Sequence, residues 1–417
     1  MLIYILATLL ACALAWKGEK AAIKWPWRVA SAIPLILVAA MRWDVGTDIY
    51  KTYFPAFRAL ECLNAGADSA AIEQFFGPLL DRLGGGNINT VGKLYANFLH
   101  VLGNQEWGFR KIMEFMAWSG LGFRGIVVLT SLLTGALVFT AIYRQSHSPV
   151  LAIYLYVATS NYFLGLNIIR QYVAIGFALV AVEFIVRRKL LPFLACIGAG
   201  MLFHTTVVLM LPCYFICRIP IKPIWGFVLL AVLLAVSSYI SPIVMWLMPK
   251  IGMGHYCRYF GRYQEFLGMF LSINVCVLAL GGWYWERARK KSPYFLVWYN
   301  MTILGSIALC FSTSLPLMKR INYFFAAPHF LLLPEILLNE ERLRVRRWLG
   351  MGIVVAFACE TWVAVWLMNK NEPLPYSISP VSNHQSLRPH RYAARSWWCV
   401  SEGHLEQFKS PVPDSLK

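Results

Sequence analysis

Charged residues are scarce in this chain. Only 14% of its 417 residues are Asp, Glu, Lys or Arg, and 59% belong to the apolar set, whereas soluble domains average about 25% and about 45–50%. The mean hydropathy is +0.57. These values exclude an ordinary soluble globular protein, because apolar blocks separated by short basic clusters fill most of the sequence. We therefore expect one membrane domain over residues 1–369, embedded in a lipid bilayer.

Acidic residues are particularly few, with 20 Asp and Glu against 38 Lys and Arg, so the formal net charge is +18. A nucleic-acid-binding protein concentrates such charge on one soluble face. Here the basic residues recur between apolar blocks instead, as in loops held against an anionic leaflet. We expect no nucleic-acid partner.

Metal-ligand patterns and a secretory leader are also missing. The ten cysteines contain no close pair outside the apolar runs, since the shortest spacing, Cys213 to Cys217, lies within one. We therefore expect no metal site and no cofactor. The first residues are apolar and lack the positive n-region of a signal peptide, which favours a first membrane span.

What the sequence has in abundance is apolar runs of helical length. They predict an all-α, polytopic integral membrane protein with about 12 transmembrane helices. The predicted spans are 2–16, 29–41, 124–143, 150–166, 171–186, 190–203, 205–217, 223–247, 267–285, 294–312, 321–338 and 349–368. One broken helix over 190–217 is the alternative to two short spans there.

Loop charge orients these spans. With two spans over 190–217, the basic residues gather on one side of the membrane, in 17–28, 144, 187–189, 218–222, 287–291 and 342–347. The positive-inside rule makes that side cytoplasmic. Both termini then face outward, together with the long segment 42–123 and a Pro-, Ser- and His-rich tail, 370–417, that we expect to be largely disordered. Apolar residues at helical spacing near 75–83 and 94–102 predict amphipathic helices in the long segment.

Polar residues gather at the outward ends of the spans. Arg170 and Arg320 each open a predicted helix, where the dipole already places positive charge. An anion such as pyrophosphate between them would compensate both. The alternative is that each arginine extends to lipid headgroups.

Three further residues on this side are candidates with ordinary alternatives. Asp44 and Asp48 follow the second span and fit either a functional role or a turn and helix cap around Gly46. His204 lies at a predicted helix break and is either a general base or a packed polar residue. Glu360 is the exceptional acid in mid-span, for which a structural role is the simpler reading.

Several short motifs carry these residues. They are R-x-x-V-G-T-D at 42–48 with aromatic residues after it, R-Q-x-x-A at 170–174, F-H at 203–204, and R-x-x-Y-F at 320–324 with P-Y at 375–376. In order and rough spacing they resemble the EpsG-type, Wzy-like exopolysaccharide polymerases of bacterial membranes. The chain departs from that family around 90–95, where a Glu-Pro is expected, and after about residue 385.

The resemblance implies a GT-C-like glycosyltransferase in the bacterial cytoplasmic (inner) membrane, with its site facing the periplasm or exterior. Such an enzyme joins polyprenyl-diphosphate-linked oligosaccharide repeat units, one serving as donor and one as acceptor, after they reach the outer leaflet. A flippase and a chain-length regulator are the implied protein partners.

The motifs also suggest roles. Arg170 and Arg320 would hold the donor pyrophosphate as the glycosidic bond breaks. The acceptor hydroxyl would pass its proton to Asp48 or His204. The remaining candidates for substrate binding are Arg42, Asp44, Gln171 and Tyr323.

Two other functions stay open at this point. An O-antigen ligase, or another lipid-linked glycosyltransferase, would use the same arginines for a single transfer. A lipid-linked oligosaccharide transporter would need ionisable groups inside the membrane, and Glu360 is its best support.

Overall fold

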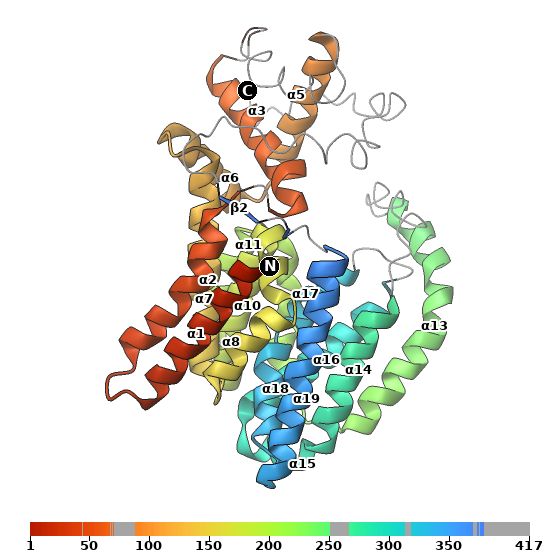
Figure 1. Ribbon diagram of the computed structural model, residues 1–417. Coiled ribbons are helices and arrows are strands. Elements are labelled where there is room, and N and C mark those ends of the chain that lie inside the picture. Colours follow the sequence, from red (N-terminus) through yellow and green to blue (C-terminus); the bar gives the residue numbers. More distant parts are fainter. Residues whose placement is uncertain are drawn as a thin grey trace.

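The computed structural model is an all-α bundle (Figure 1) and describes residues 1–43, 45–66, 68, 70, 88–250, 267–312, 318–369, 373–374 and 376–378. The first half contains α1 (Leu2–Lys20), α2 (Trp25–Met41), β1 (Arg42–Trp43), a π-helical turn η1 (Ile49–Tyr53), α3 (Phe54–Asn64), α5 (Ile88–Gly103), α6 (Trp107–Trp118), α7 (Gly122–Gln145), α8 (Pro149–Ala158), α9 (Asn161–Asn167) and α10 (Ile169–Val186).

The second half begins with a short and broken region: α11 (Leu190–Met201), the 3₁₀ turn η2 (Thr205–Met210) and α12 (Cys213–Ile216). Longer helices follow, with a two-residue strand at the end. They are α13 (Pro223–Lys250), α14 (Leu267–Trp283), α15 (Trp285–Lys291), α16 (Pro293–Cys310), α17 (Met318–Ala326), α18 (His329–Leu337), α19 (Leu343–Thr361), the π-helical turn η4 (Trp362–Leu367) and β2 (Ser377–Ile378).

Fewer helices than expected are long enough to cross a membrane by themselves. Within the described ranges five pass on length and hydropathy: α1, α7, α10, α16, and α19 continued by η4. The pair α8 and α9 makes a sixth if its 55° bend is taken as one span. The count of about 12 is therefore not confirmed. Several expected spans are shorter or broken helices: 190–217 is divided among α11, η2 and α12, and 321–338 between α17 and α18.

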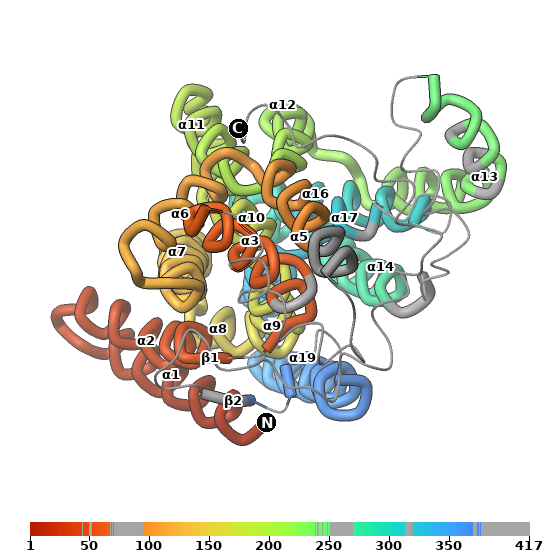
Figure 2. The backbone as a smooth tube through the Cα atoms, turned by 90° about the horizontal axis from the view of Figure 1, so that it is seen from above, coloured from red at the N-terminus to blue at the C-terminus, as the bar shows by residue number. Residues whose placement is uncertain are grey.

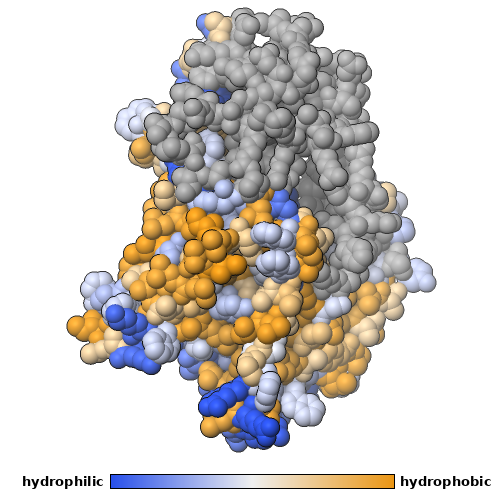
Figure 3. Space-filling model, in the orientation of Figure 1, coloured by the Kyte–Doolittle hydropathy of each residue, from blue (hydrophilic) through white to orange (hydrophobic). Residues whose placement is uncertain are grey.

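The outside of the bundle is apolar. Large hydrophobic side chains are exposed along α1, α13 and α19, among them Leu9, Trp225 and Val355, and they form part of an apolar surface in Figure 3. In water such a surface would drive aggregation, whereas in a bilayer it faces lipid. This arrangement is that of a multi-pass membrane protein.

Helix α10 lies in the middle of the bundle. Seen from above, α1 and α2 lie on one side of it and α13 on the opposite side (Figure 2). Its sequence is apolar on all faces, and most of its side chains are buried, as expected for a helix with no solvent-facing stripe. Its first residues, which include Arg170, are therefore held by packing on every side.

The described part of the segment between α2 and α7 is a folded cap and not a linker. Aromatic and aliphatic side chains of η1, α3, α5 and α6 form a second core with α7 and α10, including Tyr53, Phe57, Phe98, Phe109 and Val173. The helix expected near 94–102 is confirmed as part of α5. The apolar stretch 75–83 lies outside the described residues.

The chain closes on itself beside this cap. β2 pairs antiparallel with β1, with Arg42 opposite Ile378 and Trp43 opposite Ser377. Tyr376 donates to the Val38 carbonyl (2.9 Å), and Tyr4 donates to the Pro373 carbonyl (2.9 Å). Tyr376 of the P-Y motif thus lies beside the start of the R-x-x-V-G-T-D motif. Pro375 itself lies outside the described residues.

Candidate functional site

One carboxylate, Glu106, joins the two best sequence candidates. Arg170 donates from Nη1 to Glu106 Oε2. The other carboxylate oxygen, Oε1, lies 3.0 Å from His204 Nδ1 and accepts the Thr205 backbone N–H at 3.2 Å. All three side chains are largely shielded, with 14–16% of each exposed. We call Glu106, Arg170 and His204 the Glu106 cluster.

A close backbone approach builds this cluster. Glu106 is the residue before α6, and the Phe109 N–H donates to the Leu202 carbonyl at the end of α11 (3.2 Å). A Cβ on Gly108 would lie 2.7 Å from that same carbonyl oxygen. Because only glycine fits there, Gly108 lets α6 approach the segment that carries His204.

Aromatic rings surround the charged groups. The Arg170 guanidinium lies over the rings of Tyr53 and Phe109, at 5.3 Å and 5.7 Å, and its Nε donates to the Tyr53 hydroxyl at 3.4 Å. The His204 ring stacks on Phe324 with ring centres 6.4 Å apart and planes 5° from parallel. These contacts fix the planes of the Arg170 guanidinium and the His204 imidazole and help to shield the cluster from water.

Electrostatics favours the ionised form of Glu106. Burial alone would raise the pKa of this carboxyl, but the hydrogen bond with His204 and the positive charge of Arg170 outweigh it and hold the pKa below its ordinary value. The positive charge at the N-terminus of α10 is therefore compensated within the chain, so a bound anion is not needed to explain Arg170.

The pKa of Tyr53 depends on several charged groups nearby. Burial raises the pKa of its phenol; Arg170 and Arg320 act in the opposite direction, and the charge of Asp48 adds to the rise. Asp48, Tyr53, Arg170 and Arg320, which come from three of the motifs, thus share one electrostatic environment.

Helix α17 brings Arg320 to this environment. Gln171 donates from Nε2 to the Arg320 carbonyl (2.7 Å), which ties the start of α10 to the start of α17. The Arg320 side chain is exposed, and Phe324, four residues later, is the ring that stacks on His204. Arg170 and Arg320 therefore lie on neighbouring helix ends.

The V-G-T-D segment is fixed at the junction between α9 and α10. Asn167 Oδ1 accepts the Asp48 backbone N–H (2.9 Å) and the Thr47 hydroxyl (3.0 Å). Gly46 has φ +97°, and a Cβ there would meet the Leu166 carbonyl oxygen at 2.7 Å. The motif's glycine is thus required by both backbone conformation and contact.

Other candidates lie elsewhere. Arg42 is buried below the cap, where its Nη1 donates to the Ala39 carbonyl and to Ser131 Oγ (2.8 Å for the latter). Tyr323 lines a separate cavity with Glu360. Asp44 lies outside the described residues. In the described part of the chain, no three His, Cys, Asp or Glu residues are grouped so as to hold a metal ion.

Glu106 is the residue that sequence reasoning missed. The expected Glu-Pro was sought around 90–95, whereas the acid that reaches Arg170 precedes α6 and is followed by Trp107. Acidic residues are favoured at helix N-termini and glycine permits close backbone approach, but neither preference singles out Glu106 in the sequence.

Comparison with known proteins adds one finding. No curated protein and no solved structure matches the chain. The sequence profile described as "EpsG family" matches residues 26–378. This range includes the cap, the Glu106 cluster, α17 and the closing P-Y motif, and it covers most of the chain. The protein belongs to the EpsG family.

Proposed function

We propose that the protein is a polysaccharide polymerase that joins polyprenyl-diphosphate-linked oligosaccharide repeat units at the outer face of the cytoplasmic membrane. The observation that carries this proposal is the bridge that Glu106 makes between Arg170 and His204. The bridge joins two candidates to one carboxylate: His204, the candidate base, and Arg170, the candidate cation that would stabilise the leaving diphosphate. Family membership supports an exopolysaccharide-polymerase-like role.

His204 is the better candidate base. Both oxygens of Glu106 already accept hydrogen bonds, and its lowered pKa makes it a weak base. When the Nδ1 proton of His204 points at Glu106, Nε2 carries the lone pair that can take a proton. The carboxylate and imidazole of hydrolase triads are paired in the same way. Glu106 is then a positioning residue, and Asp48 is the alternative base.

The transfer step is balanced without a cofactor. The acceptor hydroxyl oxygen bonds to the anomeric carbon of the donor while its proton passes to His204 Nε2. The anomeric C–O bond to the diphosphate breaks, and polyprenyl diphosphate leaves with the electron pair. Arg170 and the exposed Arg320 stabilise the growing negative charge. A guanidinium has five N–H donors, so Arg170 can serve Glu106, Tyr53 and a phosphate oxygen together.

The two ends of the bundle suit this orientation. Arg170 opens α10, and Arg187 follows its end about 26 Å away at 1.5 Å per residue. At that second end, Arg144 and Arg187 pair with the buried Glu183 (2.9 Å and 2.7 Å). The positive-inside rule assigns the Arg187 end to the cytoplasm and the Glu106 cluster to the exterior. Shorter apolar helices then complete a GT-C-like set of about 12 spans in this proposal.

Product length separates this function from its competitors. A ligase, or another lipid-linked glycosyltransferase, makes one transfer, whereas a polymerase makes a ladder of lengths. A transporter makes no glycosidic bond and would leave its substrate unchanged.

The experiment is a gel profile of surface glycan from cells that lack this chain, complemented with the wild type or with Arg170→Ala. We expect the wild type to restore the ladder and Arg170→Ala to leave single repeat units, at equal amounts of protein in the membrane. A ladder that persists in the deletion strain would rule out polymerisation by this protein. A normal ladder with Arg170→Ala would remove Arg170 from the mechanism.

A further inference from the structure

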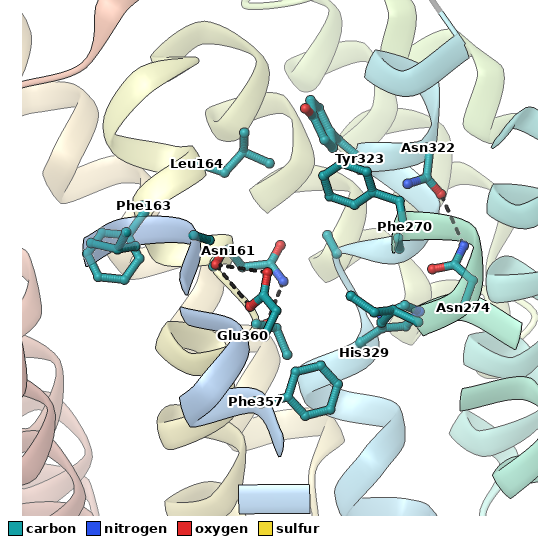
Figure 4. Close-up of a pocket in the computed structure, with 17 residues that line it drawn as sticks. Asn161, Phe163, Leu164, Phe270, Asn274, Asn322, Tyr323, His329, Phe357 and Glu360 are labelled. Atoms are coloured by element: carbon teal, nitrogen blue, oxygen red, sulfur yellow. Dashed lines mark hydrogen bonds between the residues drawn. The ribbon is translucent and has the colours of Figure 1, made fainter. Parts of the chain in front are cut away.

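A second polar site lies beside the Glu106 cluster. It is an open cavity between the α8–α9 junction, the start of α14, α17 and the end of α19 (Figure 4). Its polar lining includes Asn161, Asn274, Asn322, Tyr323, His329 and Glu360. Polar groups at this depth in a membrane bundle are costly and need a function or a partner.

One lining atom, Nε2 of His329, lacks a hydrogen-bond partner in the described part of the chain. His329 is only 5% exposed, and its Nε2 makes no hydrogen bond with any described residue. A buried polar atom left unpaired costs about 1–3 kcal/mol. A ligand that places a hydroxyl in this cavity would satisfy it.

The other polar groups of the lining offer both hydrogen-bond donors and acceptors. Asn274 donates to Asn322 Oδ1 (3.4 Å), and Ser160 donates to Glu360 (3.2 Å). Carboxamides offer donors and acceptors together, and Tyr323, Phe270 and Phe357 add aromatic faces. Such a lining can hydrogen-bond hydroxyl groups, and its aromatic rings can pack against the apolar faces of a sugar ring.

Charge excludes an anion. No lysine or arginine is among the described residues that line the cavity, and Glu360 would repel a phosphate. The cavity thus differs in chemistry from the Arg170 site, although it is close to it: Tyr172, two residues after Arg170, donates to Asn161 Oδ1 at 3.1 Å. Helix α17 contributes to both sites, with Phe324 on His204 and Asn322 in the cavity.

We infer that this cavity binds a neutral saccharide portion of the repeat unit, separately from the pyrophosphate bound at Arg170. The inference rests on the proposed function, because it assigns a sugar and a diphosphate of one substrate to neighbouring sites. His329, Asn322 and Glu360 would contact sugar hydroxyls.

The test uses the purified full-length protein in lipid nanodiscs and two probes. One is the phosphate-free repeat-unit oligosaccharide, released by mild acid from the host's own lipid-linked pool. The other is inorganic pyrophosphate. Titration calorimetry gives the affinity of wild type, His329→Phe, His329→Gln and Arg170→Ala for each. Thr302→Val is the matched control, since Thr302 is buried on α16 and bonds only its own helix, at the Trp298 carbonyl.

We expect His329→Phe to weaken oligosaccharide binding about fivefold, the loss of one hydrogen bond, and His329→Gln to restore part of it. The Phe variant should keep the thermal stability of the wild type, because His329 Nε2 loses no protein partner. Arg170→Ala should lose pyrophosphate binding and retain oligosaccharide binding, and Thr302→Val should change neither.

Three outcomes would overturn the inference: no saturable oligosaccharide binding by the wild type, wild-type affinity in His329→Phe, or an equal loss in His329→Phe and Arg170→Ala. The proposed function fails separately. If the deletion strain keeps its glycan ladder while the purified protein still binds oligosaccharide through His329, the saccharide site stands and the polymerase does not.

Discussion

Glu106 joins residues that lie 64 and 98 positions away along the chain, at Arg170 and His204. Arg170 would be unfavourable alone, because it is a cation at a helix N-terminus. The shared carboxylate compensates this charge and orients the imidazole of His204. Removing it would leave the Arg170 charge largely shielded from water without its anionic partner, which is costly.

Acid should therefore weaken the structure through Glu106. Its folded-state pKa lies below the ordinary 4.5, so its contribution is complete above that value and is lost as the pH falls through the folded-state pKa. Near neutral pH we expect the free energy of unfolding of the wild type to be about 1–3 kcal/mol larger than that of Glu106→Gln. Thermal unfolding in detergent should show this difference unchanged down to about pH 5.5 and shrinking below about pH 4. A difference that grows on acidification would contradict this account.

The grouping of Arg170, His204 and Arg320 on one side could be predicted from charge and orientation alone. The partner could not, because Glu106 lies in a segment that hydropathy treats as a loop. Which loop residue reaches Arg170 is decided by the approach of Gly108 to Leu202, a contact that only the three-dimensional structure contains. Arg42 shows the converse: its charge suggested a substrate contact, and it is buried against Ser131.

At the scale of elements, the breaks between helices position the site. Hydropathy predicts where apolar runs lie, but it does not predict a helix break within an apolar run. Ser160 has the left-handed φ of 58° and separates α8 from α9 within an apolar run. Between α17 and α18 the break lies before Pro328, which has φ −65° and precedes the first residue of α18. The first break supplies Ser160 and Asn161 to the polar cavity, and the short α17 supplies Arg320 and Phe324 to the cluster.

The contact between α6 and α11 can be tested by adding one methyl group. Gly108→Ala would place a Cβ 2.7 Å from the Leu202 carbonyl oxygen, so α6 must move away from His204. We expect a loss of about 1–3 kcal/mol of stability, as for overpacking, and a shortened or absent glycan ladder.

The matched control is Gly198→Ala on the neighbouring helix. Nothing lies within 4 Å of a Cβ at Gly198, so this variant should keep the ladder and gain up to about 1 kcal/mol from helix propensity. If both variants give the wild-type ladder, the α6–α11 contact does not position the site.

At the scale of the molecule, the two ends of the bundle differ in chemistry. In Figure 1 the loop between α1 and α2 and the basic helix α15 lie at the lower end, and the cap helices α3 and α5 lie at the upper end. Fold class and the two-ended charge pattern follow from composition and spacing. The number of spans does not, because packing in the bundle divides apolar runs into shorter helices.

Labelling of single cysteines tests this orientation. Lys111 on α6 and Glu286 on α15 are exposed, at 50% and 63% of their side chains. In a background with all ten native cysteines changed to serine, we expect Lys111→Cys to react with an impermeant maleimide in intact cells. Glu286→Cys should react only after the membrane is permeabilised. The reverse pattern would place the Glu106 cluster in the cytoplasm and exclude the proposed substrate.

The most direct test of the central claim is the surface-glycan gel of cells that produce Glu106→Gln in place of the wild type. The control is Glu114→Gln. Glu114 lies on α6, the helix that Glu106 precedes, and in the described structure it pairs only with Arg110 and Lys111. We predict that Glu106→Gln lowers polymerisation by about 100-fold or more, because His204, the proposed general base, is no longer held in position. Single repeat units should then replace the ladder, whereas Glu114→Gln should keep it. Equal ladders from the two variants, at equal protein in the membrane, would show that the Glu106 bridge is not the reaction centre.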